Sequence, residues 1–209
     1  MSFFPLPSST DRQALRQQLR RRRRALSPQE QTQAAVGLAQ QLSQTAAFIN
    51  AKSLAVYLPS DGEIDPYPLV QRALSLSKKV YLPVLHPSLP RLLWFVRWQP
   101  GQTPMDCNRF GIAEPKLKGY GLKAVHRIQP WAVDLVLMPL VGFDRQGGRL
   151  GMGGGFYDRT FDISRSRPRR PLLLGLAHAC QEVDSLPQAS WDVPMDGLAT
   201  ASALYWTRT

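Results

Sequence analysis

The sequence has few of the features that mark secreted, metal-rich or membrane-spanning proteins. Its 209 residues include two cysteines, Cys107 and Cys180, which lie far apart and form no zinc motif. We interpret both as reduced thiols of an intracellular protein. No apolar run approaches the roughly 20 residues that cross a bilayer. The N-terminus, MSFFPLPSST, also lacks the basic and apolar regions of a secretory signal. We therefore predict a cytoplasmic protein without a membrane anchor.

Histidines and the common nucleotide fingerprints are also scarce. The three histidines, His86, His126 and His178, have no spacing that suggests a metal site or a catalytic triad, so we expect structural roles. The P-loop pattern G-x-x-x-x-G-K-[ST] is absent. The dinucleotide pattern G-x-G-x-x-G begins at Gly151 but fails at Phe156. Any nucleotide site in this chain must therefore be built in another way.

Acidic residues are outnumbered, and the imbalance is concentrated near the N-terminus. The net charge is +11, and residues 1–24 hold seven arginines against one aspartate. Nucleic acid, an acidic membrane and a polyanionic small molecule would all be attracted to such a surface, and charge alone does not choose between them. The arginines at 12, 16, 20 and 24 repeat at helical spacing. We interpret Arg21–Arg23 as a solvated helical face.

The order of apolar runs predicts one α/β unit spanning residues 1–209. Basic helices are expected within residues 1–50, over 11–25 and from Ser27-Pro28-Gln29-Glu30 to about Phe48. The core of residues 51–209 has a helix near 66–76 and strand candidates at 53–60, 78–85, 91–98, 133–141, 171–178 and 198–206. The run at 133–141 is apolar enough for the middle of a parallel sheet. Alternating strands and helices predict a sheet covered by helices on both faces.

A glycine-rich segment is the most informative part of the chain. Six glycines fall within residues 147–155, although each costs conformational entropy when it is ordered. Glycine allows close backbone approach and N–H groups that turn toward one centre, as in phosphate cradles, helped by a helix beginning at about Phe156. Arg149 and Arg159 flank the run with charge suited to phosphate, and Asp158 could hold Mg²⁺. A flexible surface loop is the alternative, but the interleaved aromatic and charged residues favour a triphosphate site.

Longer strings carry a resemblance to a known family. RLGMGGGFYDR (149–159), preceded by MPLVGFDRQGG, resembles the signature of the 5-formyltetrahydrofolate cyclo-ligases. Further segments resemble the same family in the same order: RQALRQQLRRRRRALSPQEQ, YLPSDGEIDPYPLV, RFGIAEPKL and LAHACQEVDSLPQASWDVPMDGLAT. The resemblance covers residues 12–200 and is highly specific.

The resemblance implies a fold and a reaction. The expected fold is a Rossmann-like three-layer α/β sandwich with a mainly parallel central sheet. The expected reaction converts 5-formyltetrahydrofolate to 5,10-methenyltetrahydrofolate with ATP and Mg²⁺, through an N5-iminium phosphate. Such a reaction asks the protein mainly for positioning and charge neutralisation. The implied partner is a small molecule, polyglutamylated or not, with no nucleic acid or membrane, and our default is a monomer.

The resemblance also assigns roles to individual residues. Arg149 and Tyr157 would be catalytic. The nucleotide would contact Arg12, Gln13, Ala14, Leu15, Arg16, Arg149, Leu150, Gly151, Met152, Gly153, Gly154, Gly155, Phe156 and Tyr157. The folate would contact Leu58, Glu63, Met152, Gly153, Gly154, Gly155 and Phe156, and the metal would contact Asp158 and Asp192. Gly154 departs from the pattern, since many family members have lysine there.

Without the resemblance, several residues have plainer interpretations. Glu63 would be a surface carboxylate, and Asp192 would cap or terminate a turn. Two other functions also remain open at this point. A nucleic-acid-binding module would use the arginine-rich helix on phosphates, and a different ATP-using ligase or kinase could share the scaffold. Binding of folate without ATP, through Glu63, would separate the cyclo-ligase from that second alternative.

Overall fold

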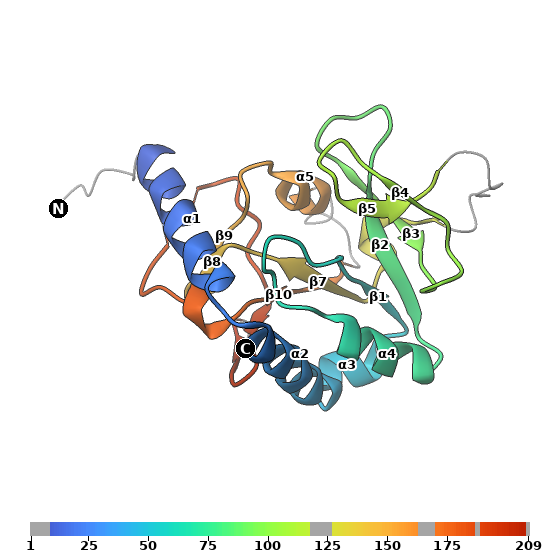
Figure 1. The fold of residues 1–209 in the computed structure, drawn as a ribbon. Coiled ribbons are helices and arrows are strands. Elements are labelled where there is room, and N and C mark those ends of the chain that lie inside the picture. The colour runs from blue at the N-terminus through green and yellow to red at the C-terminus, as the bar shows by residue number, and fades with distance from the viewer. Residues whose placement is uncertain (1–8, 118–126, 163–169, 187–188, 208–209) are drawn as a thin grey trace.

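The computed structural model describes residues 9–117, 127–162, 170–186 and 189–207 (Figure 1). The chain begins with the helices α1 (Ser9–Arg24), α2 (Pro28–Ser43) and α3 (Ala46–Asn50). Ser27 caps α2 in a reciprocal capping box with Glu30, as the sequence predicts. The prediction of one helix running to about Phe48 is wrong. Thr45 accepts a hydrogen bond from the N–H of Phe48 through its hydroxyl, so it caps α3 as a separate helix.

Among the described residues, eight strands form the central sheet in the order β12-β11-β10-β7-β1-β2-β3-β6. The strands β11, β10, β7, β1 and β2 run parallel, and β12, β3 and β6 join antiparallel at the two sides. The predicted α/β class with a mainly parallel sheet is therefore confirmed. The strands are β1 (Ser53–Ala55), β2 (Lys79–Leu85), β3 (Leu93–Arg97), β6 (Arg127–Ile128), β7 (Leu135–Pro139), β10 (Leu172–Leu176), β11 (Gly197–Ala199) and β12 (Leu204–Trp206).

Short strands and turns account for the differences from the sequence prediction. Residues 198–206 do not form one strand. Thr200 closes a turn, accepting the N–H of Ala203 through its hydroxyl at 3.0 Å, so that β11 and β12 pair antiparallel. Two small hairpins were also not predicted, β4 (Met105–Cys107) with β5 (Ala113–Pro115) and β8 (Gly142–Phe143) with β9 (Arg149–Leu150).

Helices cover both faces of the sheet because alternate strand residues point to opposite sides. Leu54 and Leu135 pack in the same cluster as α2, α3 and α4 (Tyr67–Ser75), whereas Ala55 and Val136 pack in the cluster that contains Phe161 of α5 (Phe156–Asp162). Figure 1 shows α2, α3 and α4 below the sheet and α5 above it. None of the helices in the described ranges is both long enough and apolar enough to span a membrane.

The strand order places a switch point between β1 and β7. From β1 the chain continues to the neighbouring β2, and from β7 it continues to β10 on the opposite side. The connections that follow β1 and β7 therefore diverge, and a crevice opens where they leave the sheet. Ligands of open α/β sheets bind at such points. We call residues 57–65, after β1, the glutamate loop, and residues 151–155, after β7 and the β8–β9 hairpin, the glycine loop.

Candidate active site

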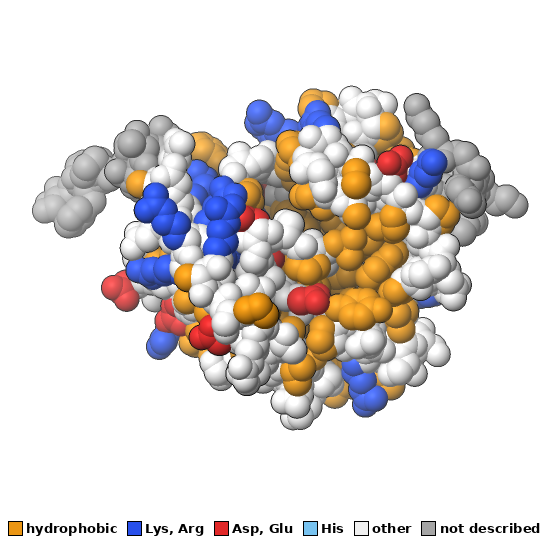
Figure 2. Space-filling model, viewed as in Figure 1, with side chains coloured by type: hydrophobic (Ala, Val, Ile, Leu, Met, Phe, Trp, Pro, Cys, Tyr) orange, Lys and Arg blue, Asp and Glu red, His pale blue; other side chains and the backbone are white. Residues whose placement is uncertain are grey.

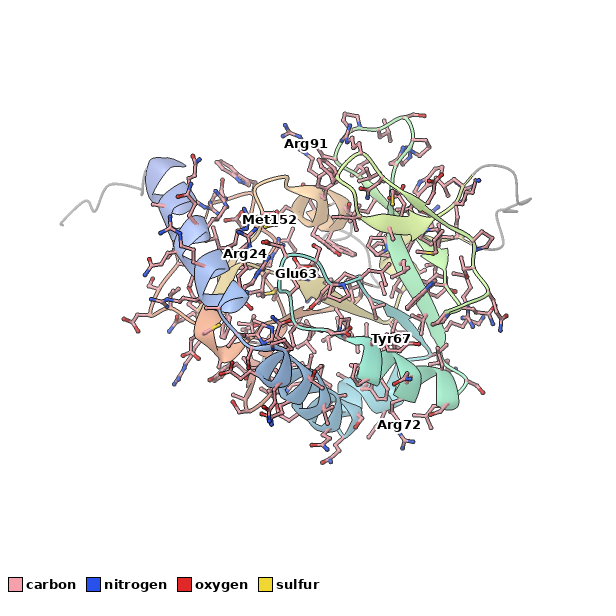
Figure 3. The ribbon with its side chains drawn as sticks, viewed as in Figure 1. Arg24, Glu63, Tyr67, Arg72, Arg91 and Met152 are labelled. Carbon is pink, nitrogen blue, oxygen red and sulfur yellow. The ribbon has the colours of Figure 1, made fainter. Side chains whose placement is uncertain are left out.

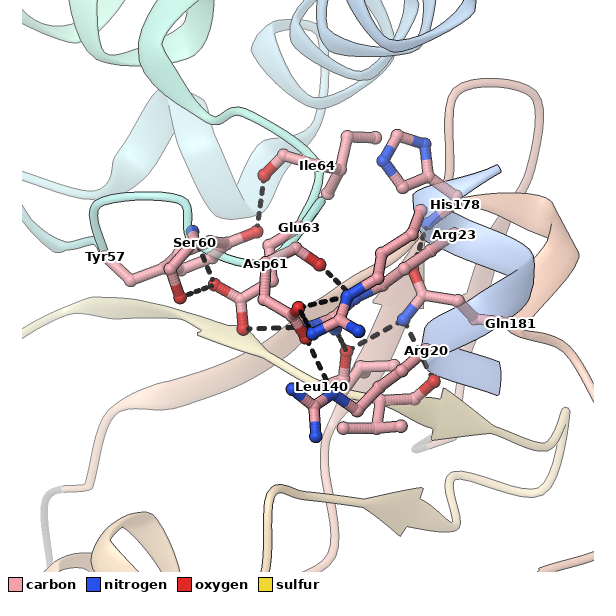
Figure 4. Close-up of polar contacts among 12 residues, drawn as sticks. Arg20, Arg23, Tyr57, Ser60, Asp61, Glu63, Ile64, Leu140, His178 and Gln181 are labelled. Carbon is pink, nitrogen blue, oxygen red and sulfur yellow. Dashed lines mark hydrogen bonds and ion pairs between the residues drawn. The ribbon is translucent and has the colours of Figure 1, made fainter. Parts of the chain in front are cut away.

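The glutamate loop turns tightly and buries its carboxylate. Asp61 and Gly62 have left-handed φ values of 53° and 76°, and the N–H of Glu63 donates to the carbonyl of Ser60 at 2.9 Å. Glu63 accepts the Ser60 N–H at 3.1 Å, and its side chain is only 10% exposed (Figure 4). Burial raises the pKa of Glu63, although Arg23 and the Ser60 hydrogen bonds oppose the rise. The interpretation of Glu63 as an ordinary surface carboxylate is therefore wrong.

An apolar pocket of about 150 Å³ adjoins this loop. Leu58, Tyr67 and Trp98 line it, and Leu58 is half-buried against the core. In Figure 2 hydrophobic side chains gather in a hollow on this face, while basic side chains gather over α1, whose basic residues are all arginine. The carboxylate residue that lines this pocket is Asp65, and Glu63 belongs to the same loop without lining the pocket. An apolar wall of this kind suits a flat ring.

The β8–β9 hairpin fixes the approach to the glycine loop. Asp144, buried at the turn, accepts N–H groups from Gln146, Gly148 and Leu186 at 3.0, 2.8 and 2.8 Å. A Cβ at Gly148 would lie 2.4 Å from the Asp144 carboxylate, so this position requires glycine. Gly153 has a left-handed φ of 96°. The expected helix start at Phe156 is confirmed by α5.

Two arginines of helix α1 contact the glycine loop and the segment around Asp192. Arg16 Nε donates to the carbonyl of Gly151 at 2.8 Å, and Arg12 pairs with Asp192 at 3.1 Å. Leu15 packs beside the cluster formed by Leu19, Val141, Leu150 and Leu186, which docks the helix on the hairpin. Gln13 and Ala14 are exposed on α1. The structure thus brings the first half of α1 and the glycine loop together, as the assigned nucleotide contacts require.

The two aspartates assigned to the metal lie close to each other. Arg149 forms an ion pair with Asp158, which also accepts the N–H of Val193 at 3.1 Å. Val193 directly follows Asp192, whose carboxylate accepts the N–H of Ala189 at 2.9 Å. In the described part of the chain, no three His, Cys, Asp or Glu side chains group as metal ligands. Two carboxylates fit Mg²⁺, which proteins commonly hold with one or two carboxylates and substrate phosphates.

Two buried guanidinium groups have unsatisfied donors at this place. The Nε atoms of Arg12 and Arg149 are buried and make no hydrogen bond to any described residue. Buried polar groups in folded proteins nearly always have partners, and donors of this kind suit an anion. Burial lowers the pKa of Arg16, the nearby charge of Arg12 lowers it further, and Asp192 partly offsets both. This crowding of positive charge is favourable when a polyanion is bound.

Two aromatic residues, Phe156 and Tyr157, directly follow the glycine loop, and Tyr157 lies close enough to the glutamate loop for the charge of Glu63 to act on it. Tyr157 stacks on Phe161 with ring centroids 6.3 Å apart. Burial raises the pKa of Tyr157, and the charge of Glu63 raises it further, so the hydroxyl stays protonated at neutral pH. Phe156 lines a second hollow of about 380 Å³, and Met152 of the glycine loop is 54% exposed. Figure 3 shows Met152 and Glu63 on the same open face.

Arg23 is the residue that the sequence interpretation missed. Its side chain is 0% exposed, so the expectation of a solvated Arg21–Arg23 face is wrong for Arg23, although Arg21 and Arg22 are exposed. Arg23 donates to the carboxylate of Asp61 at 2.7 Å, and Arg20 and Arg24 contact the same carboxylate (Figure 4). The acidic stretch 61–65, opposite in charge to α1, was the available signal.

The described histidines, His86 and His178, are consistent with structural roles. His86 Nδ1 accepts the N–H groups of Ser88 and Leu89, and burial lowers the pKa of His178. His126 lies outside the described residues. Both cysteines are free, as the sequence predicts.

Comparison with known proteins identifies the family of this chain. Residues 8–201 match the 5-formyltetrahydrofolate cyclo-ligase family. The chain belongs to this family. The 5-formyltetrahydrofolate cyclo-ligase of Haemophilus influenzae is 41% identical over 184 residues, covering 88% of this chain and 94% of that protein. The Escherichia coli K12 cyclo-ligase is 39% identical over 187 residues, covering 90% and 98%. The resemblance read from the glycine-rich signature is confirmed.

Solved structures agree with this family assignment. The 5,10-methenyltetrahydrofolate synthetase of Aquifex aeolicus has a TM-score of 0.77 and 30% identity, covering 95% of this chain and 93% of that one. The Mycoplasma pneumoniae synthetase has a TM-score of 0.68 at 24% identity, which supports the fold alone.

The glycine at position 154, where the sequence departs from the family pattern, is explained by the packing of Phe156. A Cβ there would lie 2.8 Å from the ring of Phe156, so a lysine would require that ring to move.

Proposed function

We propose that this chain is an ATP- and Mg²⁺-dependent 5-formyltetrahydrofolate cyclo-ligase that forms 5,10-methenyltetrahydrofolate and releases ADP and phosphate. One observation carries the proposal. Arg12, Arg16 and Arg149 converge on the glycine loop with two buried, unpartnered Nε donors, next to a loop that buries Glu63. An anion site, and a buried carboxylate in the loop that lines an apolar pocket, are what a triphosphate and a pterin require.

The nucleotide side of the proposal uses α1 and the glycine loop. We assign the triphosphate to Arg12–Arg16 and Arg149–Tyr157, with the unpartnered guanidinium donors on phosphate oxygens. Mg²⁺ would be held by Asp158 and Asp192 and would neutralise charge on the triphosphate. Each of these carboxylates is paired with an arginine, so the arginines and the metal share them.

The folate side uses the glutamate loop. The adjacent N–H donors of a pterin ring match the two oxygens of the Glu63 carboxylate. Leu58 and the pocket of Tyr67 and Trp98 provide an apolar wall. Met152–Phe156 close the other side and bring the formyl group to the triphosphate. A reacting pair held in this way gains rate mainly from orientation.

The proposed chemistry uses nucleophiles that belong to the substrate. The formyl oxygen attacks the γ-phosphorus, the bond to the β–γ bridging oxygen breaks, and ADP leaves with that electron pair. The resulting N5-iminium phosphate is attacked at its formyl carbon by N10. Loss of the N10 proton and of inorganic phosphate completes the five-membered ring. Arg149 stabilises charge on the transferring group, and the protonated Tyr157 hydroxyl can donate a hydrogen bond.

The test is the near-ultraviolet absorbance of the methenyl product. The purified protein is mixed with 5-formyltetrahydrofolate and Mg-ATP, and then with each component left out. We expect a rise that requires ATP and the metal, and that is lost in Glu63→Ala and Asp158→Ala variants with unchanged far-UV circular dichroism. A folded wild-type protein that binds ATP but gives no rise would refute the proposal and favour another ATP-using enzyme.

A further inference from the structure

We propose that Arg23 is a positioning residue for folate, which holds the glutamate loop in place against the connection that leaves β7. The inference rests on the proposed function, and it concerns a side chain that contacts neither the glycine loop nor the phosphate-binding arginines in the described structure. Arg23 sits at the end of α1, two turns beyond Arg16 on the same helix. Helix α1 therefore contacts the proposed nucleotide site with one end and the proposed folate site with the other.

The hydrogen bonds of Arg23 join two segments that diverge at the switch point. Its Nε donates to the carbonyl of Asp61 at 2.8 Å, and one terminal nitrogen donates to the Asp61 carboxylate at 2.7 Å. The other terminal nitrogen donates to the carbonyl of Leu140, which follows β7, at 3.1 Å. Gln181 also donates to the Leu140 carbonyl, at 2.8 Å. One buried guanidinium thus fixes the distance between the two connections (Figure 4).

The conformation of the glutamate loop depends on this support. Asp61 is a non-glycine residue with a φ of 53°, a conformation that persists only when its surroundings hold it. Gly62 packs directly on the helix, since a Cβ there would lie 3.4 Å from the carbonyl oxygen of Arg23. Glu63 follows these two residues immediately. A loop released from Arg23 would therefore move the carboxylate that is proposed to read the pterin.

Arg23 also acts on the charge of Glu63. One Arg23 nitrogen lies 3.9 Å from a Glu63 oxygen. Asp61 of the same loop raises the pKa of Glu63, and Glu63 in turn raises the pKa of Tyr57 after β1 and of Tyr157 of α5. His178 forms a hydrogen bond with the backbone of Gly62. Arg20 and Arg24 pair with Asp61, whereas Arg23 acts on Glu63 and favours the ionised form that accepts N–H donors. Its removal leaves burial and the Asp61 charge to push the Glu63 pKa upward.

Steady-state kinetics of three variants tests the proposal. Arg23→Gln removes the charge, Arg23→Lys keeps the charge but loses the three-way fork, and Arg22→Gln changes an exposed neighbour as the matched control. We expect Arg23→Gln to raise the KM for 5-formyltetrahydrofolate about tenfold or more, with a much smaller change in the KM for ATP. The acid limb of its kcat/KM profile for folate should move to higher pH. Arg23→Lys should return that limb toward wild type, and Arg22→Gln should match wild type.

The outcomes separate this inference from the proposed function. A folded Arg23→Gln variant with wild-type folate KM and acid limb would overturn it, and so would equal rises in both KM values, which indicate a general structural role. If Arg23→Gln does not fold, Arg23→Lys decides: a raised folate KM with an unmoved acid limb supports the proposal, and an unchanged KM overturns it. A wild-type protein that forms no methenyl product would instead refute the cyclo-ligase function itself.

Discussion

Replacing Asp144 by alanine should destabilise the whole approach to the glycine loop. The Asp144 carboxylate is 2% exposed and accepts three backbone N–H groups, from Gln146, Gly148 and Leu186. A hydrogen bond to a charged acceptor contributes about 1.5 kcal/mol or more, and donors left unsatisfied in a buried place add to the loss. At the low end of this range, three such bonds give a loss of about 4.5 kcal/mol in the free energy of unfolding. At 2–4 °C per kcal/mol for a chain of this size, the melting temperature should fall by about 9–18 °C.

Two measurements check this magnitude. Urea unfolding followed by circular dichroism gives the change in free energy, and calorimetry gives the melting temperature. Asp106→Ala is the control, because Asp106 is exposed and its carboxylate accepts the N–H of the adjacent Cys107. The control should change stability by less than about 0.5 kcal/mol. Below its melting temperature, Asp144→Ala should also show a raised KM for ATP, since the hairpin positions Arg149.

If Asp144→Ala lowers the melting temperature by less than about 3 °C, this reasoning is refuted. It would mean that water replaces the carboxylate at the turn, and that the hairpin does not depend on Asp144 for its shape. A large loss of stability with an unchanged KM for ATP would refute only the second step. The hairpin would then be important for folding but not for the position of Arg149.

Two further predictions concern the loops. Burial alone would raise the pKa of Asp61, but hydrogen bonds from Arg20, Arg24 and Arg23 lower it to about 2, against an ordinary value of 3.8. A lowered folded-state pKa stabilises the protein above pH 3.8, so Asp61→Asn should cost about 1–2 kcal/mol of stability at pH 7 after a discount for solvent screening. The difference in stability between the two proteins should vanish as the pH falls through 2. Urea unfolding of both proteins at several pH values measures this difference, and a difference that stays constant with pH would contradict the prediction. Gly153→Ala should lose about 1–2 kcal/mol of stability, because the φ of Gly153 is 96°, and it should raise the KM for ATP. The control is Gly111→Ala at an exposed left-handed glycine, which should lose similar stability and leave the KM for ATP unchanged. Equal changes of the KM in the two variants would contradict a role for the glycine loop.

The parts of the fold that the sequence predicted are those with strong local signals. The apolar runs at 53–60, 133–141 and 171–178 contain β1, β7 and β10, because strands buried on both faces read as continuous hydrophobic segments. The break between α2 and α3 was missed because Thr45 interrupts an otherwise helical pattern with one side-chain hydrogen bond. Short strands such as β4 and β5 leave too little periodicity to detect.

The candidate site was predictable in composition more than in geometry. The glycines and the charged residues that flank them were visible as a cluster, and the structure places them together. The pairing of Arg149 with Asp158 and the burial of Arg23 depend on loop conformations and on partners distant in sequence, which residue spacing does not report. The single-domain organisation, the monomeric state and the cytoplasmic location stay predictions, as do the individual site assignments.

The contact between Arg12 and Asp192 joins residues 180 positions apart, and the contact between Arg16 and Gly151 spans 135. Such long separations delay contact formation, because the chain between them must be ordered first. During synthesis, Arg12 emerges long before its partner exists, so the strands at the centre of the sheet can assemble before Arg12 and Arg16 make these contacts. The site is then the last part of the molecule to form. ATP bound there should slow unfolding much more than it speeds folding.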